Sequence, residues 1–130
     1  MNSPSTPLID KPQVGIVLFA HGSRDAQWRV PIESVAAQIA RGSGDVNVRC
    51  AYLELCEPNL AQAAIDLIAK GAHKIRVFPV FFGVGKHARE DLPVLMAQLA
   101  KDHPAIDFEL LPTAGEHPAL IALLAGLATA

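Results

Sequence analysis

Two histidines in this chain each follow an apolar run, where their imidazoles could do chemistry at the end of a strand. His21 follows residues 14–20 and precedes a Gly-Ser-Arg tripeptide, and His87 closes a second run that begins at Val80. Imidazole nitrogen is a suitable ligand for divalent Co, Fe, Ni or Zn. A neutral imidazole is also a general base near pH 7. Two such histidines at one edge of a sheet predict a metal site.

Two glutamates follow the second apolar run of the chain. Glu54 stands at its end, where it would be a hard oxygen ligand or a proton acceptor, and Glu57 lies further out in the loop, where it could meet a ligand N–H. A single histidine at a strand end is more often a hydrogen-bonded structural residue. The convergence of His21, His87 and Glu54 favours a functional site, and it leaves open whether Glu54 binds the metal or only accepts a proton.

The residues around His87 suit a flat, anionic ligand better than a nucleotide. Gly83 and Gly85 let backbone approach a planar group closely. The phosphate-binding loop pattern fails, because Val80 stands where it needs glycine and His87 where it needs Ser or Thr. A phosphohistidine phosphatase is disfavoured too, since Ala20 precedes His21 where that chemistry uses arginine. The nearby basic residues form either a solvated rim or a cluster that captures carboxylates; they are Arg24, Arg29, Lys86 and Arg89.

The elements that position these side chains alternate regularly along the chain. Apolar, β-branched runs at residues 14–20, 46–53, 74–80 and 106–111 predict four strands, and a segment with helical periodicity follows each. Such alternation predicts an α/β fold, a three-layer, four-stranded parallel sheet with helices on both faces. We expect a flavodoxin-like strand order of 2-1-3-4, with ligands beyond the carboxyl ends of the strands. Pro31 is expected near the start of its helix.

Size and composition predict one domain at residues 14–130, after a mobile tail at residues 1–13 that lacks the apolar core of a signal peptide. The net charge of -2 argues against a nucleic-acid partner. No apolar run reaches the roughly 20 residues of a membrane span. Two cysteines without a metal-site or redox spacing indicate reduced thiols in a cytoplasmic protein.

The last predicted helix, at residues 119–128, carries no charge. A surface helix normally has a polar face. This helix is therefore either internal to the domain or packed against a partner subunit, and we favour partial burial at a subunit contact.

Three motifs in order resemble the small sirohydrochlorin chelatases, the short form of the class II tetrapyrrole metal chelatases known as the CbiX family. They are the strand that opens into His21–Arg24, the segment at residues 52–58, and the segment at residues 85–93. The resemblance runs from about Val14 to Leu124. It implies a homodimer that binds sirohydrochlorin, a tetrapyrrole, and inserts Co²⁺ or Fe²⁺, with Ni²⁺ as a third metal. No nucleotide is needed, and the pathway would lead to cobalamin or sirohaem.

The resemblance also implies roles for single residues. His21 would be metal ligand and proton acceptor, His87 the second metal ligand, and Glu54 a catalytic residue in metal delivery or proton abstraction. Glu57 would contact substrate. The loop that would line the tetrapyrrole pocket comprises Phe82, Gly83, Val84, Gly85 and Lys86. Because sirohydrochlorin carries many carboxylates, we expect Arg24, Lys86 or Arg89 to grip its rim.

Two alternatives use the same residues or the same fold. A non-catalytic carrier of metal or tetrapyrrole would also need the histidines. A flavin- or dinucleotide-binding domain would suit the fold, but the loop after the first strand lacks a glycine-rich phosphate cradle.

Overall fold

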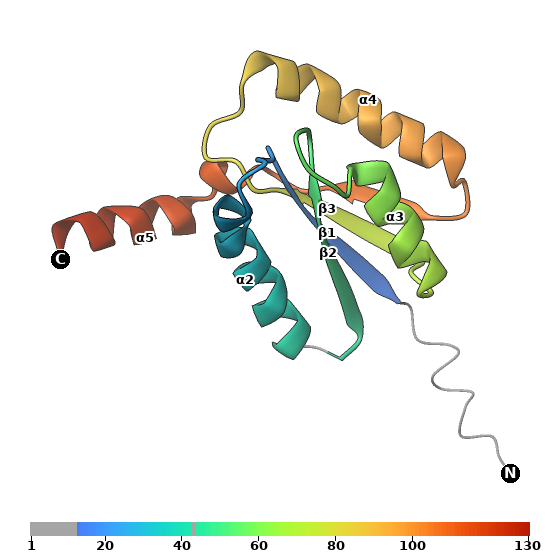
Figure 1. The fold of residues 1–130 in the computed structure, drawn as a ribbon, viewed down its shortest axis with the longest axis horizontal. Helices are drawn as coiled ribbons and strands as arrows, with labels where there is room; N and C mark the ends of the chain where they lie inside the picture. Colours follow the sequence, from blue (N-terminus) through green and yellow to red (C-terminus); the bar gives the residue numbers. More distant parts are fainter. Residues whose placement is uncertain (1–12, 43) are drawn as a thin grey trace, which may run out of the picture.

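The computed structural model describes residues 13–42 and 44–130, and its strands and helices alternate along the chain (Figure 1). The elements are β1 (Val14–Ala20), α2 (Ala26–Gly42), β2 (Val46–Tyr52), α3 (Leu60–Ala69), β3 (Lys74–Pro79), α4 (Lys86–Asp102), β4 (Asp107–Leu110), the short 3-10 helix η1 (Ala114–Glu116) and α5 (Pro118–Thr129). All four predicted strands are present, with ends within one residue of the expected ones. The expected mobile tail lies outside the described residues, except for Gln13.

The sheet has the predicted order β2-β1-β3-β4, and every neighbouring pair is parallel. The first residue of β1, Val14, pairs with Val46 of β2 and with Lys74 of β3, so these three strands begin together. At the other end, Ala20 pairs with Tyr52 and Phe19 with Pro79. The carboxyl ends of three strands therefore form one edge, and the loops that follow them meet there.

Successive side chains of β1 enter two different cores, one on each face of the sheet. Val17 and Phe19 are buried with the apolar residues of α3 and α4. Leu18 and Ala20 point to the opposite face, where they pack with Ile32 of α2. This period-2 alternation is the pattern of a strand buried on both sides. Helices lie on both faces, as predicted, with α2 on one and α3 and α4 on the other.

Hydrogen bonds at the start of helix α2 explain why the expected position of Pro31, near the helix start, is wrong. Helix α2 begins at Ala26, because the Asp25 carboxylate accepts the Gln27 N–H at 2.9 Å and the Ser23 hydroxyl accepts the Asp25 N–H at 3.0 Å. Pro31 therefore lies inside the helix, in its second turn, and not at its start. Helix α3 begins with a complete capping box between Asn59 and Gln62.

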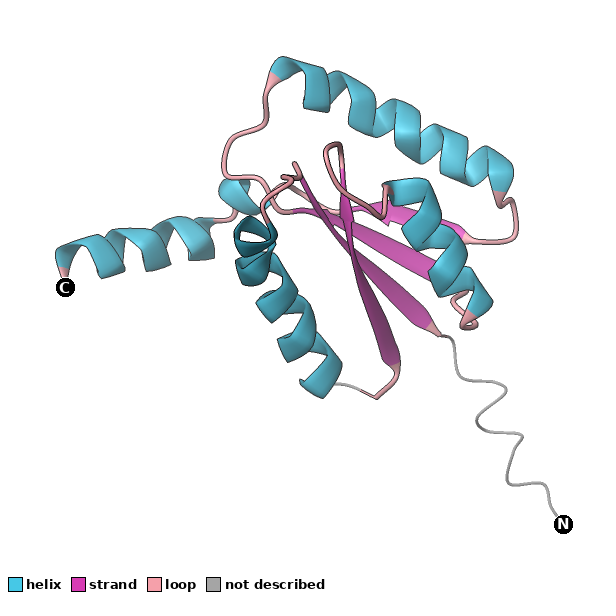
Figure 2. Cartoon of the chain, in the orientation of Figure 1, coloured by secondary structure: helices cyan, strands magenta, loops and turns pink. Residues whose placement is uncertain are grey.

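The final helix, α5, extends away from the rest of the domain (Figures 1 and 2). None of its residues is buried. It follows η1 directly, because His117 ends η1 and is also the residue before the first turn of α5. The interpretation in which the uncharged helix is internal to its own domain is therefore wrong for this chain.

Candidate active site at the carboxyl edge of the sheet

The pairing of β1 with β2 continues for two residues into the loops that follow them. The Leu53 N–H donates to the Ala20 carbonyl at 2.9 Å, and the Glu54 N–H donates to the His21 carbonyl at 3.1 Å. These two bonds hold the loop backbones side by side beyond the last strand pair. His21 and Glu54, which are 33 positions apart in the sequence, become neighbours as a result.

The side chains of His21 and Glu54 meet at this edge. Nε2 of His21 lies 3.2 Å from Oε2 of Glu54, and the two side chains are 57% and 55% exposed. An ion pair between exposed groups contributes little to stability. The pair is important for chemistry instead. An imidazole and a carboxylate in contact can share a proton or hold one metal ion between them, and both side chains stay accessible to a large ligand.

Gly22 permits the close approach of the two loops. Its φ of 109° lies in the left-handed region, and a Cβ at this position would collide with the backbone oxygen of Glu54. Position 22, directly after the predicted ligand His21, is therefore glycine for a steric reason. Gly115 has a similar role, because a Cβ there would collide with the backbone oxygen of Phe82. The Gly115 N–H donates to the Phe81 carbonyl at 2.9 Å, which ties η1 to the loop after β3.

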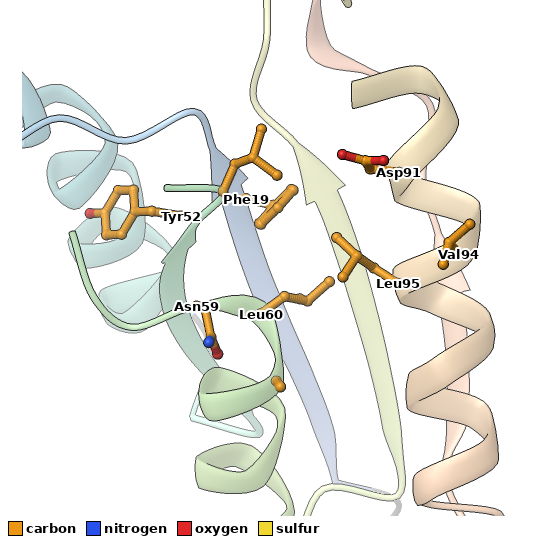
Figure 3. Close-up of a pocket in the computed structure, with 9 residues that line it drawn as sticks. Phe19, Tyr52, Asn59, Leu60, Asp91, Val94 and Leu95 are labelled. Atoms are coloured by element: carbon orange, nitrogen blue, oxygen red, sulfur yellow. The ribbon is translucent and has the colours of Figure 1, made fainter. Parts of the chain in front are cut away.

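A cleft of about 320 Å³ opens between α3 and α4 (Figure 3); its lining includes Leu53, the residue before Glu54, but neither member of the pair. Leu60 of α3 and Leu95 of α4 point toward each other across it, and Asp91 of α4 points toward the strand ends (Figure 3). The rings of Phe81 and Phe19 meet edge to face at 6.1 Å, and the ring of Phe81 also lies 6.4 Å from that of His21. Phe19 lines the cleft, so the ring of Phe81 lies between a residue of the cleft and His21 of the pair.

The loop between β3 and α4 presents the residues expected to contact substrate. Phe82 is 73% exposed, the highest value among the large apolar side chains of the described residues. A Cβ at Gly83 or Gly85 would meet nothing within 4 Å, so the surface beside both glycines is open. A second cleft, of about 450 Å³, runs along this loop. Its lining includes Phe82, Gly83, Val84, Arg89 and Glu116.

His87 and Lys86 form the first turn of α4, and both are exposed. Within residues 13–42 and 44–130, no three His, Cys, Asp or Glu side chains lie close enough to hold a metal ion. The structure thus brings together His21 and Glu54, but His87 does not complete a three-ligand cluster with them. Any ion on the pair would keep most of its coordination positions free.

The remaining predicted site residues occupy different surroundings. Arg24 is exposed, whereas Arg29 donates from Nη1 to the Ser23 carbonyl at 3.1 Å and so braces the loop after β1. Glu57 lines a separate pocket of about 250 Å³ beside α2 and β2, together with Cys50 and Tyr52. Burial raises the pKa of both Cys50 and Tyr52. Both groups are therefore protonated at neutral pH.

Sequence reasoning did not single out Phe81, Asp91 or Gly115. Asp91 falls within a recognised motif, but a charged residue in the second turn of a helix is expected to face solvent, and nothing in the sequence places it at a cleft. Phe81 stands in an apolar run, where an aromatic ring is expected to be core. Only the contact between η1 and the loop after β3 reveals why position 115 is glycine.

Comparison with known families decides the relationship that the motifs suggested. The CbiX family model matches residues 15–129. The chain belongs to the CbiX family. The crystal structure of a CbiX protein from Marinobacter aquaeolei VT8 superposes with a TM-score of 0.76 at 28% identity, covering 89% of this chain and 94% of that one.

Two curated relatives are longer than this CbiX chain. It is 30% identical over 107 residues to the chloroplastic sirohydrochlorin ferrochelatase of Arabidopsis thaliana, a match that covers 82% of this chain and 48% of the relative. It is 34% identical over 83 residues to a sirohydrochlorin cobaltochelatase of Methanopyrus kandleri, covering 64% and 58%. The chain thus spans about half of the length of these relatives.

The fold is shared with a chelatase that was crystallised in complex with cobalt. The sirohydrochlorin chelatase SirB from Bacillus subtilis subspecies spizizenii, in complex with cobalt, has a TM-score of 0.76 at 20% identity. The alignment covers 90% of this CbiX chain and 50% of the SirB chain. In the described part of the CbiX chain, no helix has the length and apolar character needed to cross a membrane.

Proposed function

We propose that this protein is a sirohydrochlorin chelatase, a lyase that inserts Co²⁺ or Fe²⁺ into the tetrapyrrole without ATP. The observation that carries the proposal is the contact of His21 with Glu54, 3.2 Å apart on an open sheet edge beside a cleft. Metal insertion needs a partly dehydrated ion on exchangeable ligands and a base for two pyrrole N–H protons. An exposed imidazole and carboxylate provide both functions in one place.

The distance of 3.2 Å between Nε2 of His21 and Oε2 of Glu54 allows the two atoms to hold a metal ion and, once it has left, to take up a proton. Nitrogen and carboxylate oxygen ligands of first-row ions such as Zn²⁺ bind at about 2.0–2.2 Å. One ion can therefore lie within that distance of both Nε2 of His21 and Oε2 of Glu54 without moving either backbone. When the ion passes to the four pyrrole nitrogens, two protons leave the ring. The vacated pair takes one of them, shared between Nε2 and Oε2, and water takes the other.

We place the tetrapyrrole over the sheet edge, against the loop at residues 82–86. The exposed ring of Phe82 and the open backbone at Gly83 and Gly85 suit a flat macrocycle. Val84 lines the adjoining cleft.

Arg24 and Lys86 are exposed cations on either side of the edge, suited to the carboxylates of sirohydrochlorin. Removal of both charges should raise the KM for sirohydrochlorin, and an unchanged KM would exclude this role.

His87 and Glu57 are proposed as secondary participants. His87 is an accessible second metal ligand on the approach to the site, and it does not close the coordination sphere. A closed four-ligand site would trap the ion, so separation of the ligands favours delivery. Glu57 is proposed to contact substrate from the far end of the loop after β2.

We further propose that the chain works as a homodimer in the cytoplasm, in cobalamin or sirohaem synthesis. Support for a dimer comes from the uncharged α5 and from the SirB chain, which is only half covered by this one. Two short chains would then correspond to one long chain.

The proposal is tested by following the visible spectrum of sirohydrochlorin with Co²⁺, Fe²⁺ and Ni²⁺ in turn. We expect the protein to accelerate formation of the cobalt or iron complex well above the spontaneous rate, over many turnovers. A carrier of the same fold would bind metal or sirohydrochlorin but leave the rate of complex formation at the spontaneous value. That result would overturn the enzyme assignment in favour of the carrier.

A further inference from the structure

One buried side chain close to the loop at residues 82–86 has no partner for its polar group. Thr113 lies between β4 and η1, it is 7% exposed, and it is the only polar residue that is buried in the described chain. Its hydroxyl does not cap η1, although the residue holds the capping position. Across residues 13–42 and 44–130, no group forms a hydrogen bond with this hydroxyl. A buried hydroxyl without a partner destabilises a folded protein, so its position here favours a role in binding.

Thr113 lines the cleft of about 450 Å³ that runs along the loop between β3 and α4. This volume is within the range of small-molecule sites. Leu92 and Pro93 of α4 and Leu110 of β4 supply apolar walls. The surroundings of the hydroxyl therefore suit a ligand that combines an apolar part with a group able to bond the hydroxyl.

Two charged side chains of opposite sign line the same cleft. Arg89 comes from the first turn of α4 and Glu116 from η1, and both are exposed. Over the described ranges, they form no ion pair with each other or with any other group. The Arg89 guanidinium and the Thr113 hydroxyl are both donors, and a carboxylate accepts from two donors at once. Glu116 opposes a carboxylate, but water and salt screen an exposed charge.

Two adjacent phenylalanines join this cleft to the pair of His21 and Glu54. The ring of Phe81 lies 6.4 Å from that of His21, and Phe82, the next residue, lines the cleft. The Gly115 N–H donates to the Phe81 carbonyl at 2.9 Å, so η1 is held against this loop. A macrocycle whose centre lies over the pair therefore extends its periphery toward the cleft. The periphery is where sirohydrochlorin carries its carboxylates.

We propose that the cleft is a subsite for one peripheral carboxylate of the tetrapyrrole. The Thr113 hydroxyl and the Arg89 guanidinium donate to this carboxylate, and its aliphatic arm packs against Leu92 and Leu110. The subsite fixes the rotation of the macrocycle about the axis through its centre, which a metal-binding pair below the four pyrrole nitrogens cannot do. It also selects tetrapyrroles that carry an acidic arm at this place on the ring. The inference rests on the proposed function and specifies how the substrate is recognised.

The test is the dissociation constant of metal-free sirohydrochlorin, measured through its fluorescence on the full chain. Thr113→Val removes the hydroxyl and keeps the shape of the side chain. We expect its affinity to fall about 10-fold, the usual effect of losing one hydrogen bond to a charged group. Its melting temperature should stay equal or rise, because a buried unpaired hydroxyl is gone. A threonine with a purely structural role would instead lower the melting temperature and leave the affinity unchanged.

The two charges of the cleft should act in opposite directions. Arg89→Gln should weaken binding about 5-fold, and less at high salt, because it removes an exposed attractive charge. Glu116→Gln should tighten binding about 2-fold, because it removes a repelling charge. Arg41→Gln is the matched control and should bind like the wild type, since Arg41 is exposed in the last turn of α2, at the amino edge of the sheet.

A Thr113→Val variant that binds sirohydrochlorin as tightly as the wild type would overturn the inference. Sodium benzoate distinguishes a free acid from an arm of the macrocycle. If benzoate raised the melting temperature of the wild type but not of Thr113→Val, and sirohydrochlorin bound both equally, the cleft would belong to a free acid and the inference would fail. Binding needs no metal, so the expected pattern without metal insertion would contradict the proposed reaction and still support the subsite. Metal insertion with unchanged affinity in Thr113→Val and Arg89→Gln would overturn the subsite alone.

Discussion

At the scale of residues, the molecule is organised around one imidazole and one carboxylate. The type and position of His21 and Glu54 at strand ends are readable from the sequence, and so is their convergence on one edge. Their direct contact at 3.2 Å depends on two backbone hydrogen bonds between loops, which no local pattern encodes. The same limit applies to His87, because its distance from the pair depends on the length and path of a glycine-containing loop.

Replacement of Glu54 by Gln tests the role of the carboxylate. The amide keeps the shape of the side chain, but it is a poor metal ligand and cannot take a proton. We expect the insertion rate to fall by about 10- to 100-fold, the usual effect of losing a group that supports a metal-binding histidine. The spectral assay measures it, with Glu109→Gln on β4 as control, because Glu109 is an exposed carboxylate that pairs with Lys74 and Arg76. A rate equal to that of the control would show that Glu54 has no part in the reaction.

At the scale of elements, the sequence predicts the strands well because each falls in a short apolar or β-branched run flanked by polar residues. Strand order also follows, since parallel alternating units have few arrangements. Pro31 was expected near the start of its helix, and it lies in the second turn of α2. Pro31 is a strong local indicator of a helix start, but capping by Ser23 and Asp25 stabilises an earlier one. Capping side chains in a polar loop have several possible partners, and only the folded loop selects among them.

Gly22→Ala should disrupt the loop that carries His21. Alanine is strained at a φ of 109°, and its Cβ would collide with the Glu54 backbone oxygen. Strain of this kind costs about 1–3 kcal/mol, so the melting temperature and the insertion rate should both fall. Gly42→Ala is the matched control, because nothing lies within 4 Å of a Cβ there. Equal stability of the two variants would contradict this account of the loop.

At the scale of the whole molecule, two exposed regions of the described chain are distinct. The carboxyl edge of the sheet holds the pair and its clefts, and the α2 face carries a largely apolar groove of about 440 Å³. The sequence identifies α5 as an uncharged helix, but internal packing and subunit packing require the same composition. The structure rejects internal packing, because none of the residues of α5 is buried and the helix extends away from its domain (Figure 1).

The most direct test of the central claim is the initial rate of cobalt and iron insertion into sirohydrochlorin by His21→Ala. His103→Ala is the matched control, because His103 ends α4 at the opposite edge of the sheet. Loss of a group that holds metal and accepts a proton should lower the rate by about 100-fold or more, with the control unchanged. A His21→Ala variant that inserts both metals at the wild-type rate would contradict the account.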